Sequence, residues 1–190
     1  YQGDGTSGLY IYGIQVEQAT YPTSYIPTNG TSQTRLKDVC VDAGDASTFN
    51  DSEGVLYTEI ATLANDGTRS ITLSNGGNNN RILISYNPNG RLDVNLTSDG
   101  VFQAIFNYSG VANPSEMNKI AFKYKQNDFA LWVNGVEVGT DSSGITPIGL
   151  DKLNFSTTNA AADFFFANVK QVLYFPTALS DDECIELTTI

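Results

Sequence analysis

The sequence predicts an all-β fold, an antiparallel two-sheet sandwich with one short helix near its C-terminal end. Short segments in which apolar residues alternate or run together occupy most of the chain, and no long helical pattern interrupts them. Turn-forming Asn-Gly or Asp-Gly pairs lie between several of these segments. Aromatic residues make up 11% of the chain, with ten Tyr and ten Phe. This composition suits pleated strands better than helices.

Six segments have the apolar pattern of a strand. In chain order they are 54–63 (GVLYTEIATL), 81–86 (RILISY), 91–97 (RLDVNLT), 101–108 (VFQAIFNY), 119–125 (KIAFKYK) and 129–133 (FALWV). Asn89-Gly90, Asp99-Gly100 and Asn134-Gly135 suit the positive φ angles of a type I′ turn. Because parallel strands need long crossover connections, these short turns predict an antiparallel meander.

A short helix is predicted after residue 179. Ser180 and Glu183 have the spacing of a capping box, and Asp181 and Asp182 place negative charge in the first turn, where the helix dipole favours it. Such a helix would turn Leu179, Cys184 and Leu187 toward the sandwich.

The first 35 residues differ in character from the rest of the chain. Residues 9–16 (LYIYGIQV) predict a single strand, which a connector rich in Pro, Thr and Ser follows. One strand cannot bury itself. We therefore expect residues 1–35 to hold the terminal strand of an upstream β domain and a linker, or a strand that pairs with another chain. The sandwich domain is expected over residues 36–190.

The charge balance limits the classes of partner. The net charge is −11, from 21 acidic and 10 basic residues, which argues against nucleic acid and anionic membranes. The same charge would repel polyanionic glycans unless a local basic patch or a bridging cation compensates. No apolar stretch is long enough for a membrane span. Cys40 and Cys184 are too few for a disulfide scaffold. The two cysteines could form one disulfide or remain as two buried free thiols. Free thiols are the prediction, and the disulfide is the alternative.

Two parts of the sequence resemble known families. The residues Tyr12, Gly13, Gln15, Glu17 and Ser24–Thr28 resemble the closing strand of a carbohydrate-binding jelly roll that is common in bacteriophage tail and fibre proteins. Residues 119–138 and 168–187 resemble a concanavalin A-like, laminin-G-like jelly roll. The resemblance implies a lectin-like carbohydrate-binding module in an extracellular or virion-associated adhesin that recognises a polysaccharide of its host. Fold resemblance alone does not name a ligand.

The strand alternation gives candidate sugar-binding residues. A sugar ring stacks on a flat aromatic side chain, and planar polar side chains hydrogen-bond its hydroxyls. Sorting each strand into two faces places Trp132 outside, near lysines, with polar residues outside on other strands. The predicted sugar-binding residues are Trp132, Lys123, Asp93, Asn95, Gln103 and Asn107. Trp132→Ala is then expected to abolish binding and to leave the fold intact. The alternatives are that Trp132 packs under a loop and that the other residues form an ordinary hydrated sheet face. The loop at residues 75–80 is another candidate contact.

Catalysis is not expected. The chain has no histidine, which removes the commonest general base and metal ligand. Glycosidases and lyases of this fold resemble one another in an E-x-D-x-x-E strand, or in a Q-I/V-H element with a Y-x-K-x-G-x-Y strand, and neither pattern occurs. Glu59, Asp93 and Glu137 are isolated strand acids. A polysaccharide-degrading enzyme is therefore the third alternative. The second is a structural module of a virion or fibre that mediates assembly, in a homo-oligomer.

No cofactor is expected apart from Ca²⁺. Four acidic residues lie within twelve positions, and Asp42, Asp45 and Asp51 are the candidate ligands, with Glu53 beside them. Laminin-G-like domains often bind Ca²⁺ through loop carboxylates. The segment lacks the D-x-D-x-D-G spacing of a strong calcium motif, so a hydrated acidic loop is the competing interpretation.

Overall fold

The computed structural model describes residues 4–5, 8, 11–16, 24–34, 40–63, 67–158 and 162–190. The chain divides into two compact units, residues 1–38 and residues 39–190. The sequence had placed this division at residue 35.

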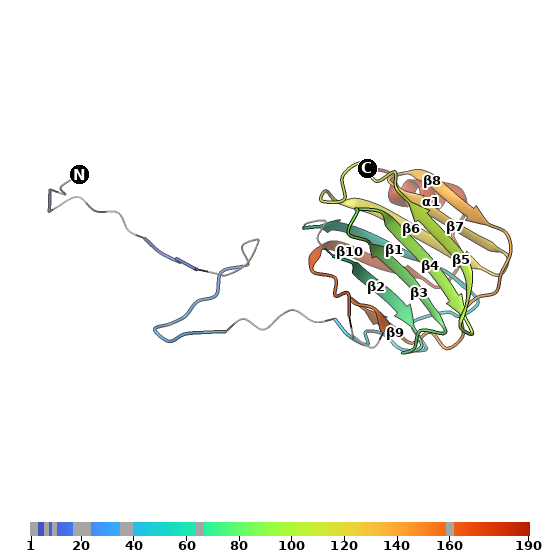
Figure 1. The fold of residues 1–190 in the computed structure, drawn as a ribbon, viewed down its shortest axis with the longest axis horizontal. Coiled ribbons are helices and arrows are strands. Elements are labelled where there is room, and N and C mark those ends of the chain that lie inside the picture. Colours follow the sequence, from blue (N-terminus) through green and yellow to red (C-terminus); the bar gives the residue numbers. More distant parts are fainter. Residues whose placement is uncertain are drawn as a thin grey trace. The chain divides into compact units, whose positions relative to one another are not determined.

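The second unit is a sandwich of two five-stranded antiparallel sheets (Figure 1). Sheet A has the order β5-β4-β3-β2-β9, and sheet B has the order β10-β1-β6-β7-β8. The elements are β1 (Glu53–Thr62), β2 (Arg69–Ser74), β3 (Arg81–Tyr86), β4 (Leu92–Ser98), β5 (Val101–Tyr108), β6 (Asn118–Lys125), β7 (Asp128–Val133), β8 (Val136–Asp141), β9 (Lys152–Asn154), β10 (Ala167–Phe175) and α1 (Asp181–Thr188). The predicted fold class is confirmed.

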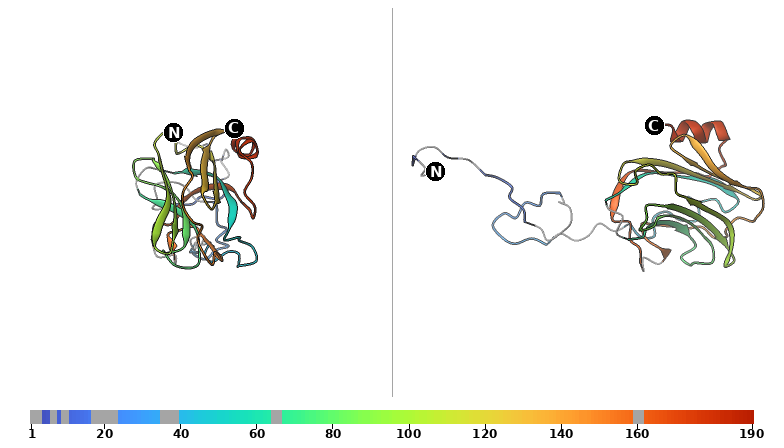
Figure 2. Two further views of the ribbon diagram at one scale, coloured as in Figure 1. Left: turned by 90° about the vertical axis from the view of Figure 1, so that its right-hand side faces the viewer. Right: turned by 45° about the horizontal axis from the view of Figure 1, so that its top comes forward.

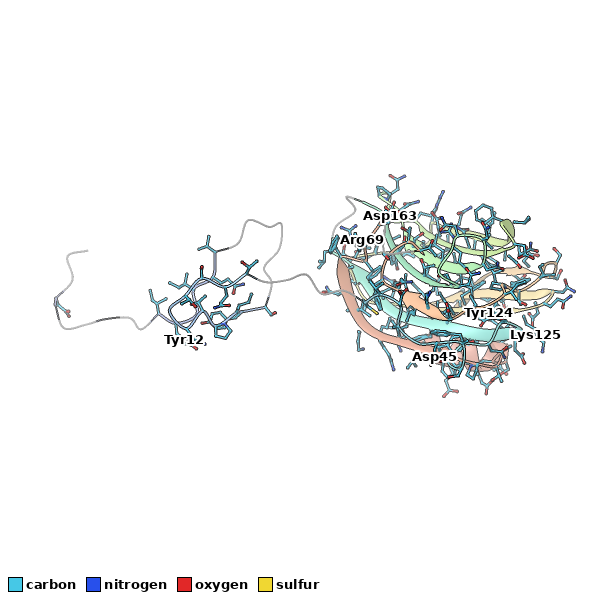
Figure 3. All side chains as sticks on the ribbon, turned by 90° about the horizontal axis from the view of Figure 1, so that it is seen from below. Tyr12, Asp45, Arg69, Tyr124, Lys125 and Asp163 are labelled. Carbon is cyan, nitrogen blue, oxygen red and sulfur yellow. The ribbon has the colours of Figure 1, made fainter. Side chains whose placement is uncertain are left out.

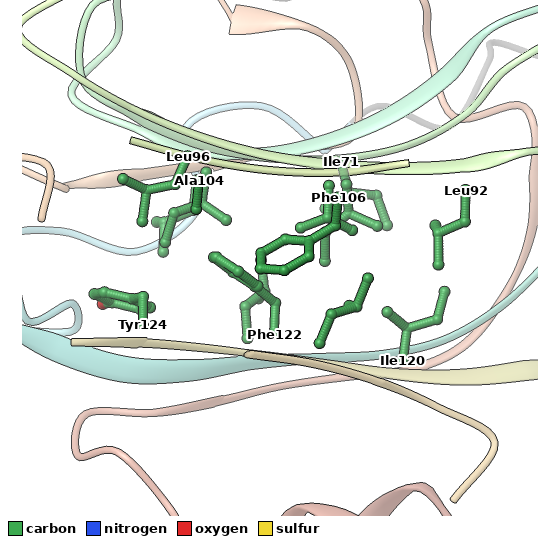
Figure 4. Packing of buried hydrophobic residues seen from close by; sticks show 14 of the residues in the cluster. Ile71, Leu92, Leu96, Ala104, Phe106, Ile120, Phe122 and Tyr124 are labelled. Atoms are coloured by element: carbon green, nitrogen blue, oxygen red, sulfur yellow. The ribbon is translucent and has the colours of Figure 1, made fainter. Parts of the chain in front are cut away.

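The main core fills the space between the two sheets (Figure 4). Each strand contributes every second residue to it, as Leu92, Val94 and Leu96 do from β4. Phe106 from sheet A meets Phe122 from sheet B edge to face, with ring centroids 5.9 Å apart. This alternation determines which side chains of each strand point away from the core.

Helix α1 packs on the outer surface of sheet B, against β6, β7 and β8. Figure 2 shows the helix on one side of the sandwich and the strands of sheet A on the other. The predicted capping box between Ser180 and Glu183 is present. Cys184 is buried in a second apolar cluster beneath the helix, and Leu179 and Leu187 pack against it, so the predicted inward face is confirmed. Cys40 and Cys184 are both free.

Two of the three predicted hairpin turns have the expected backbone. Asp99 and Gly100 have φ angles of 48° and 79°, and Asn134 and Gly135 have φ angles of 52° and 82°. The turn at Asn89-Gly90 is different, because only Gly90 has a positive φ. The Oδ1 atom of Asn87 accepts hydrogen bonds from the backbone N–H groups of Asn89 and Arg91. This side chain organises a five-residue loop in place of a two-residue turn.

The six predicted strands are present with ends shifted by at most one residue. β2 and β9 were not predicted. β2 (RSITLS) does alternate, with Ile71 and Leu73 in the core and Ser70, Thr72 and Ser74 on the outer face, so it could have been predicted from its sequence. β9 has only three residues, which is too short for a sequence pattern. The first half of β8 and nearly all of β10 lie within the two segments that carry the laminin-G-like resemblance.

In the first unit, the predicted strand at residues 9–16 is not formed as a sheet strand over its described part, residues 11–16. Residues 9 and 10, and Glu17 of the motif, lie outside the described residues. Other residues of the motif contact one another. Gln15 accepts a hydrogen bond from the Ile26 N–H at 2.9 Å through its Oε1 atom. Tyr12 (Figure 3) faces Tyr25 with ring centroids 6.0 Å apart.

Candidate functional site

The six predicted sugar-binding residues lie on two opposite surfaces of the sandwich. Trp132 and Lys123 belong to sheet B, and the other four belong to strands β4 and β5 of sheet A. The structure therefore does not bring the six together. The two outer surfaces have to be considered separately.

Trp132 points away from the main core, as predicted, but it is 0% exposed. It lies in the cluster beneath helix α1 with Tyr57 and Cys184. The prediction of an accessible ring is wrong, because the helix covers this part of the sheet. With the ring enclosed in this way, Trp132 offers no face on which a sugar could stack.

Lys123 belongs to the same buried arrangement. Its Nζ atom lies 5.4 Å from the centre of the Trp132 ring and forms ion pairs with Asp181 at 2.9 Å and Asp128 at 3.1 Å. Burial acts to lower the pKa of Lys123, but the hydrogen bonds and charges of Asp181 and Asp128 outweigh it, and the pKa is raised. Lys123 therefore fastens the first turn of α1 to the sheet, and its ammonium is already saturated.

Helix α1 does not cover the outer face of sheet A, since it packs against β6, β7 and β8 of the other sheet. The outward residues Ser70, Thr72 and Ser74 of β2 are nevertheless 0% exposed, and the Thr72 hydroxyl donates to the carbonyl of Ser156, so the β2 side of this face is covered and its exposed outward residues lie on β5. Strand register aligns its outward side chains in three rows across the sheet. From β5 toward β9 these are row 1 (Phe102, Thr97, Arg81, Ser74, Lys152), row 2 (Ile105, Asn95, Leu83, Thr72, Asn154) and row 3 (Asn107, Asp93, Ser85, Ser70). Three of the predicted residues, Asp93, Asn95 and Asn107, lie in these rows.

Row 3 ends beside an open pocket. Asp93 pairs with Arg91, with 2.6 Å between Oδ1 and Nε, and it also accepts a hydrogen bond from Asn87. Asn107 is exposed next to it. The pocket, about 360 Å³ in volume, is lined by Asn87, Asn89, Gly90, Arg91, Ser109, Val111, Ala112 and Pro114. Its polar lining continues the polar character of row 3.

A β-bulge between Leu96 and Thr97 changes the face of Phe102. Strict alternation along β5 would place Phe102 in the core with Ala104 and Phe106. The bulge shifts the register so that Phe102 pairs with the outward-facing Thr97, and its side chain is 54% exposed. Gln103 sits at this irregularity, where its Oε1 atom accepts a hydrogen bond from the Ile145 N–H. The accessible aromatic ring of this face is therefore Phe102, which sequence reasoning missed.

Arg81 is a second residue that sequence reasoning missed. Its Nη1 atom donates to Asn78 at 2.9 Å and to Thr158 at 3.4 Å. Burial lowers the pKa of Arg81 from its ordinary value. The signal was available in the strand itself, because Ile82 and Ile84 point inward and Arg81 must then point outward. Asn78 also gives the predicted contact loop at residues 75–80 a direct link to this face.

The predicted calcium ligands do not converge. Asp45 caps its own loop by accepting hydrogen bonds from Ser47 and Thr48, which lowers its pKa. Asp51 accepts hydrogen bonds from the backbone N–H groups of Gly149 and Leu150. Over the described ranges, no group of three or more Asp, Glu, Cys or His residues is placed to hold a metal ion. Asp45 and Asp51 thus order loops of the chain through hydrogen bonds. Binding of Ca²⁺ stays a prediction.

Comparison with known proteins adds a family and a set of similar structures. Residues 41–184 match the model of the concanavalin A-like lectin/glucanases superfamily. No individual curated protein matches the sequence. The carbohydrate-binding module CBM40 of the Ruminococcus gnavus IT-sialidase, solved with α2,3-sialyllactose, superposes with a TM-score of 0.63 at 19% identity, over 81% of this chain and 97% of that one.

More distant structures have the same fold. Domains LG4-5 of the mouse laminin α1 chain superpose with a TM-score of 0.56 at 12% identity, over 76% of this chain and 40% of that one. The binding domain of botulinum neurotoxin serotype G superposes with a TM-score of 0.57 at 14% identity, over 79% and 37%. In the described part of the chain, no helix is long and apolar enough to cross a membrane.

Proposed function

This chain belongs to the concanavalin A-like lectin/glucanases superfamily, and from that premise we propose that it is a non-catalytic glycan-binding module whose ligand lies on the outer face of sheet A. The observation that carries the proposal is the pairing of an exposed aromatic ring with an exposed amide side chain on the same edge of that face. Phe102 is 54% exposed at the β5 end of row 1. Asn107, at the β5 end of row 3, is exposed as well.

The chemistry of this face suits a sugar. A pyranose presents an apolar C–H face and a rim of hydroxyls, and a binding surface for it combines an aromatic ring with amide and hydroxyl groups. Phe102 can stack on one sugar ring, and the exposed amide of Asn107 on the same strand can hydrogen-bond a hydroxyl of a neighbouring sugar unit.

The similar structures support the same assignment. The CBM40 structure is described as bound to sialyllactose, and its extent matches the sandwich of this chain almost completely. The sandwich thus has the size of a carbohydrate-binding module that folds as one unit.

Two observations support the absence of catalysis. Asp93, the one carboxylate in the three rows, is held by Arg91 and Asn87. Glu59 on sheet B is held by Lys170, with 2.7 Å between the charged atoms. Glycoside hydrolysis needs a pair of carboxyl groups on either side of the scissile bond. A single saturated carboxylate does not supply that pair.

We place the module in an adhesin outside the cell or on a virion, where it recognises host polysaccharide, as in a phage tail or fibre. The motif residues at the start of the chain support this setting. Gln15 hydrogen-bonds to Ile26 and to Ser24, and the ring of Tyr12 lies beside that of Tyr25. The motif residues are therefore held together by contacts among themselves.

A second function, assembly without sugar binding, is favoured by the edge strand β5. Its sequence VFQAIFNY contains no charged residue, although the chain carries a net charge of −11. Val101 and Ile105 are 60% and 51% exposed on it. Edge strands usually carry charges that prevent pairing with another sheet, so an uncharged edge suits contact with a neighbouring subunit.

A glycan array followed by titration calorimetry tests the proposal. The protein is expected to bind a defined subset of glycans, and Phe102→Ala is expected to weaken binding at least tenfold. Val136→Ala is the matched control, because Val136 is equally exposed but lies on β8 of sheet B. A folded protein that binds no glycan would contradict the proposal. Light scattering that shows a stable oligomer, dissociated by Ile105→Lys, would favour assembly.

A further inference from the structure

The guanidinium group of Arg81 is only partly used by the protein. Its Nη1 atom is held by Asn78 and Thr158. Its Nε atom is buried and has no hydrogen-bond partner, so a ligand cannot reach it. Asn78 and Thr158 thus fix the orientation of the group from one side and leave the terminal Nη2 atom as the donor for a ligand.

Arg81 also lacks a counter-charge. Ion pairs in the described part of the chain hold Arg91, Lys123, Lys125 and Lys170, but none includes Arg81. Burial lowers the pKa of Arg81 from its ordinary value. A partly desolvated, unpaired cation is unusual in a protein with a net charge of −11.

A second cation lies in the same row. Lys152 on β9 and Arg81 on β3 both pair with Ser74 of the strand between them. Two strand spacings separate them, about 10 Å. Lys152 likewise forms no ion pair within the described residues. Rows 1 and 2 contain no acidic residue, so this part of the face is locally positive.

The ring of Phe102 lies at a distance from Arg81 that a small glycan can span. Phe102 and Arg81 both pair with Thr97 on β4, again two strand spacings apart, or about 10 Å. A disaccharide covers this span. One of its rings can stack on Phe102 while a charged group on the other reaches Arg81.

We propose that the outer face of sheet A selects a glycan that carries a carboxylate, with the terminal Nη2 atom of Arg81 binding the carboxylate and Lys152 adding a second positive charge. The inference rests on the proposed function and adds the class of ligand. Sialic acids and uronic acids both present such a group. The negative charge of the rest of the protein disfavours densely charged polyanions, so a ligand with isolated carboxylates is expected.

Titration calorimetry on the whole chain tests this, with four probes. They are 3′-sialyllactose, its carboxyl methyl ester, a glucuronate-containing disaccharide and lactose. The unmodified protein is expected to bind at least one of the two acids at least tenfold more tightly than the ester or lactose, because hydrogen bonds to a charged group contribute about 1.5–3 kcal/mol. The preferred acid distinguishes a sialic acid ligand from a uronic acid ligand.

Variants identify the residue. Arg81→Gln is expected to reduce affinity for the acid to that for the neutral probe. Arg81→Lys keeps the charge but not the guanidinium that Asn78 and Thr158 orient, and it is expected to lose most of the preference. Lys125→Gln removes an exposed charge from sheet B and is the matched control, with no expected change. Raising the salt concentration should weaken binding of the acid and not of lactose.

The outcomes separate the two proposals. Equal binding of acid and ester by the unmodified protein would overturn the carboxylate inference and leave glycan binding intact. The same holds if Arg81→Gln keeps the full preference. A folded protein that binds none of these probes, and no glycan on the array, would overturn both. If Arg81→Gln melts below the assay temperature, Lys152→Gln replaces it in the titrations. The inference is overturned if Lys152→Gln keeps both the preference for the acid over the ester and the salt dependence of acid binding.

Discussion

The outer surfaces of the two sheets differ in what covers them, although their strands alternate in the same way. On sheet B, the outward residues Tyr57, Ala121 and Trp132 lie beneath α1 and form a second apolar cluster. On sheet A, the outward residues Phe102, Ile105 and Asn107 remain exposed. Strand alternation therefore determines the direction of a side chain, but a distant segment of the chain decides whether that side chain reaches solvent.

The difference also separates stability from binding. The outer face of sheet B is fastened by ion pairs from Lys123 and by the capping box of Ser180, so its residues hold the helix in place. On the outer face of sheet A, the β5 side chains of Phe102 and Asn107 are exposed and hold no other element in place. Substitutions on sheet B should lower the free energy of unfolding, and substitutions on sheet A should mainly lower affinity.

The largest effect is expected for Trp132→Ala. Removing a fully buried tryptophan leaves a cavity and costs about 3–5 kcal/mol of unfolding free energy. Urea denaturation followed by circular dichroism measures it. Trp132→Phe is the control, expected to cost less, since it keeps a ring and removes an indole N–H that has no partner. If Trp132→Ala keeps its stability but loses glycan binding, the comparison of the two faces is wrong.

Lys123→Met is expected to cost about 2 kcal/mol, in the range for hydrogen bonds to charged groups. Asp128 and Asp181 are 50% and 61% exposed, so no buried charge is left behind. Because the pKa of Lys123 is raised in the folded state, its contribution is complete below the unfolded pKa of about 10.4 and is lost as the pH rises through the folded value. Chemical denaturation of both proteins from pH 8 to 12 should show the stability gap closing; a constant gap would exclude the ion pairs as its source.

Ser180→Ala is expected to cost about 1 kcal/mol, the usual effect of losing an N-cap. The Ser180 hydroxyl and N–H also lower the pKa of Glu183. A lowered carboxyl pKa stabilises the folded state above the ordinary value of 4.5, and that stabilisation disappears as the pH falls through the lowered value. Thermal melts at pH 7 and pH 3 measure both effects. Ser180→Asp should restore most of the loss at pH 7, and a failure to do so would argue against capping.

Phe102→Ala is expected to have the smallest effect on stability, within about 0.5 kcal/mol, because the side chain is largely exposed. Its effect on glycan affinity is expected to be large, as proposed above. Measuring the unfolding free energy and the affinity on the same sample checks both. A loss of more than about 2 kcal/mol would assign Phe102 to the core, and the outer face of sheet A would lose its aromatic ring.

The sequence located part of the candidate site. Sorting β4 into two faces placed Asp93 and Asn95 outward, and the structure agrees. The same sorting gave the wrong face for Phe102, because a bulge adds one residue to β5 and no local pattern marks it. The outward position of Arg81 could have been predicted by applying the same alternation to β3. Its hydrogen bonds to Asn78 and Thr158 could not have been predicted, because Thr158 is 77 residues away in the chain.

By itself, the sequence determined the class of fold, six of the strands, the helix with its capping box and the absence of histidine. These follow from interactions between residues close together in the chain, such as alternation, turn chemistry and capping. The tertiary structure alone decided that Trp132 is covered and Phe102 is exposed, and that Arg81 and Lys152 share a row. These properties depend on which distant segments meet, and the solvent exposure of a side chain is a property of that whole arrangement.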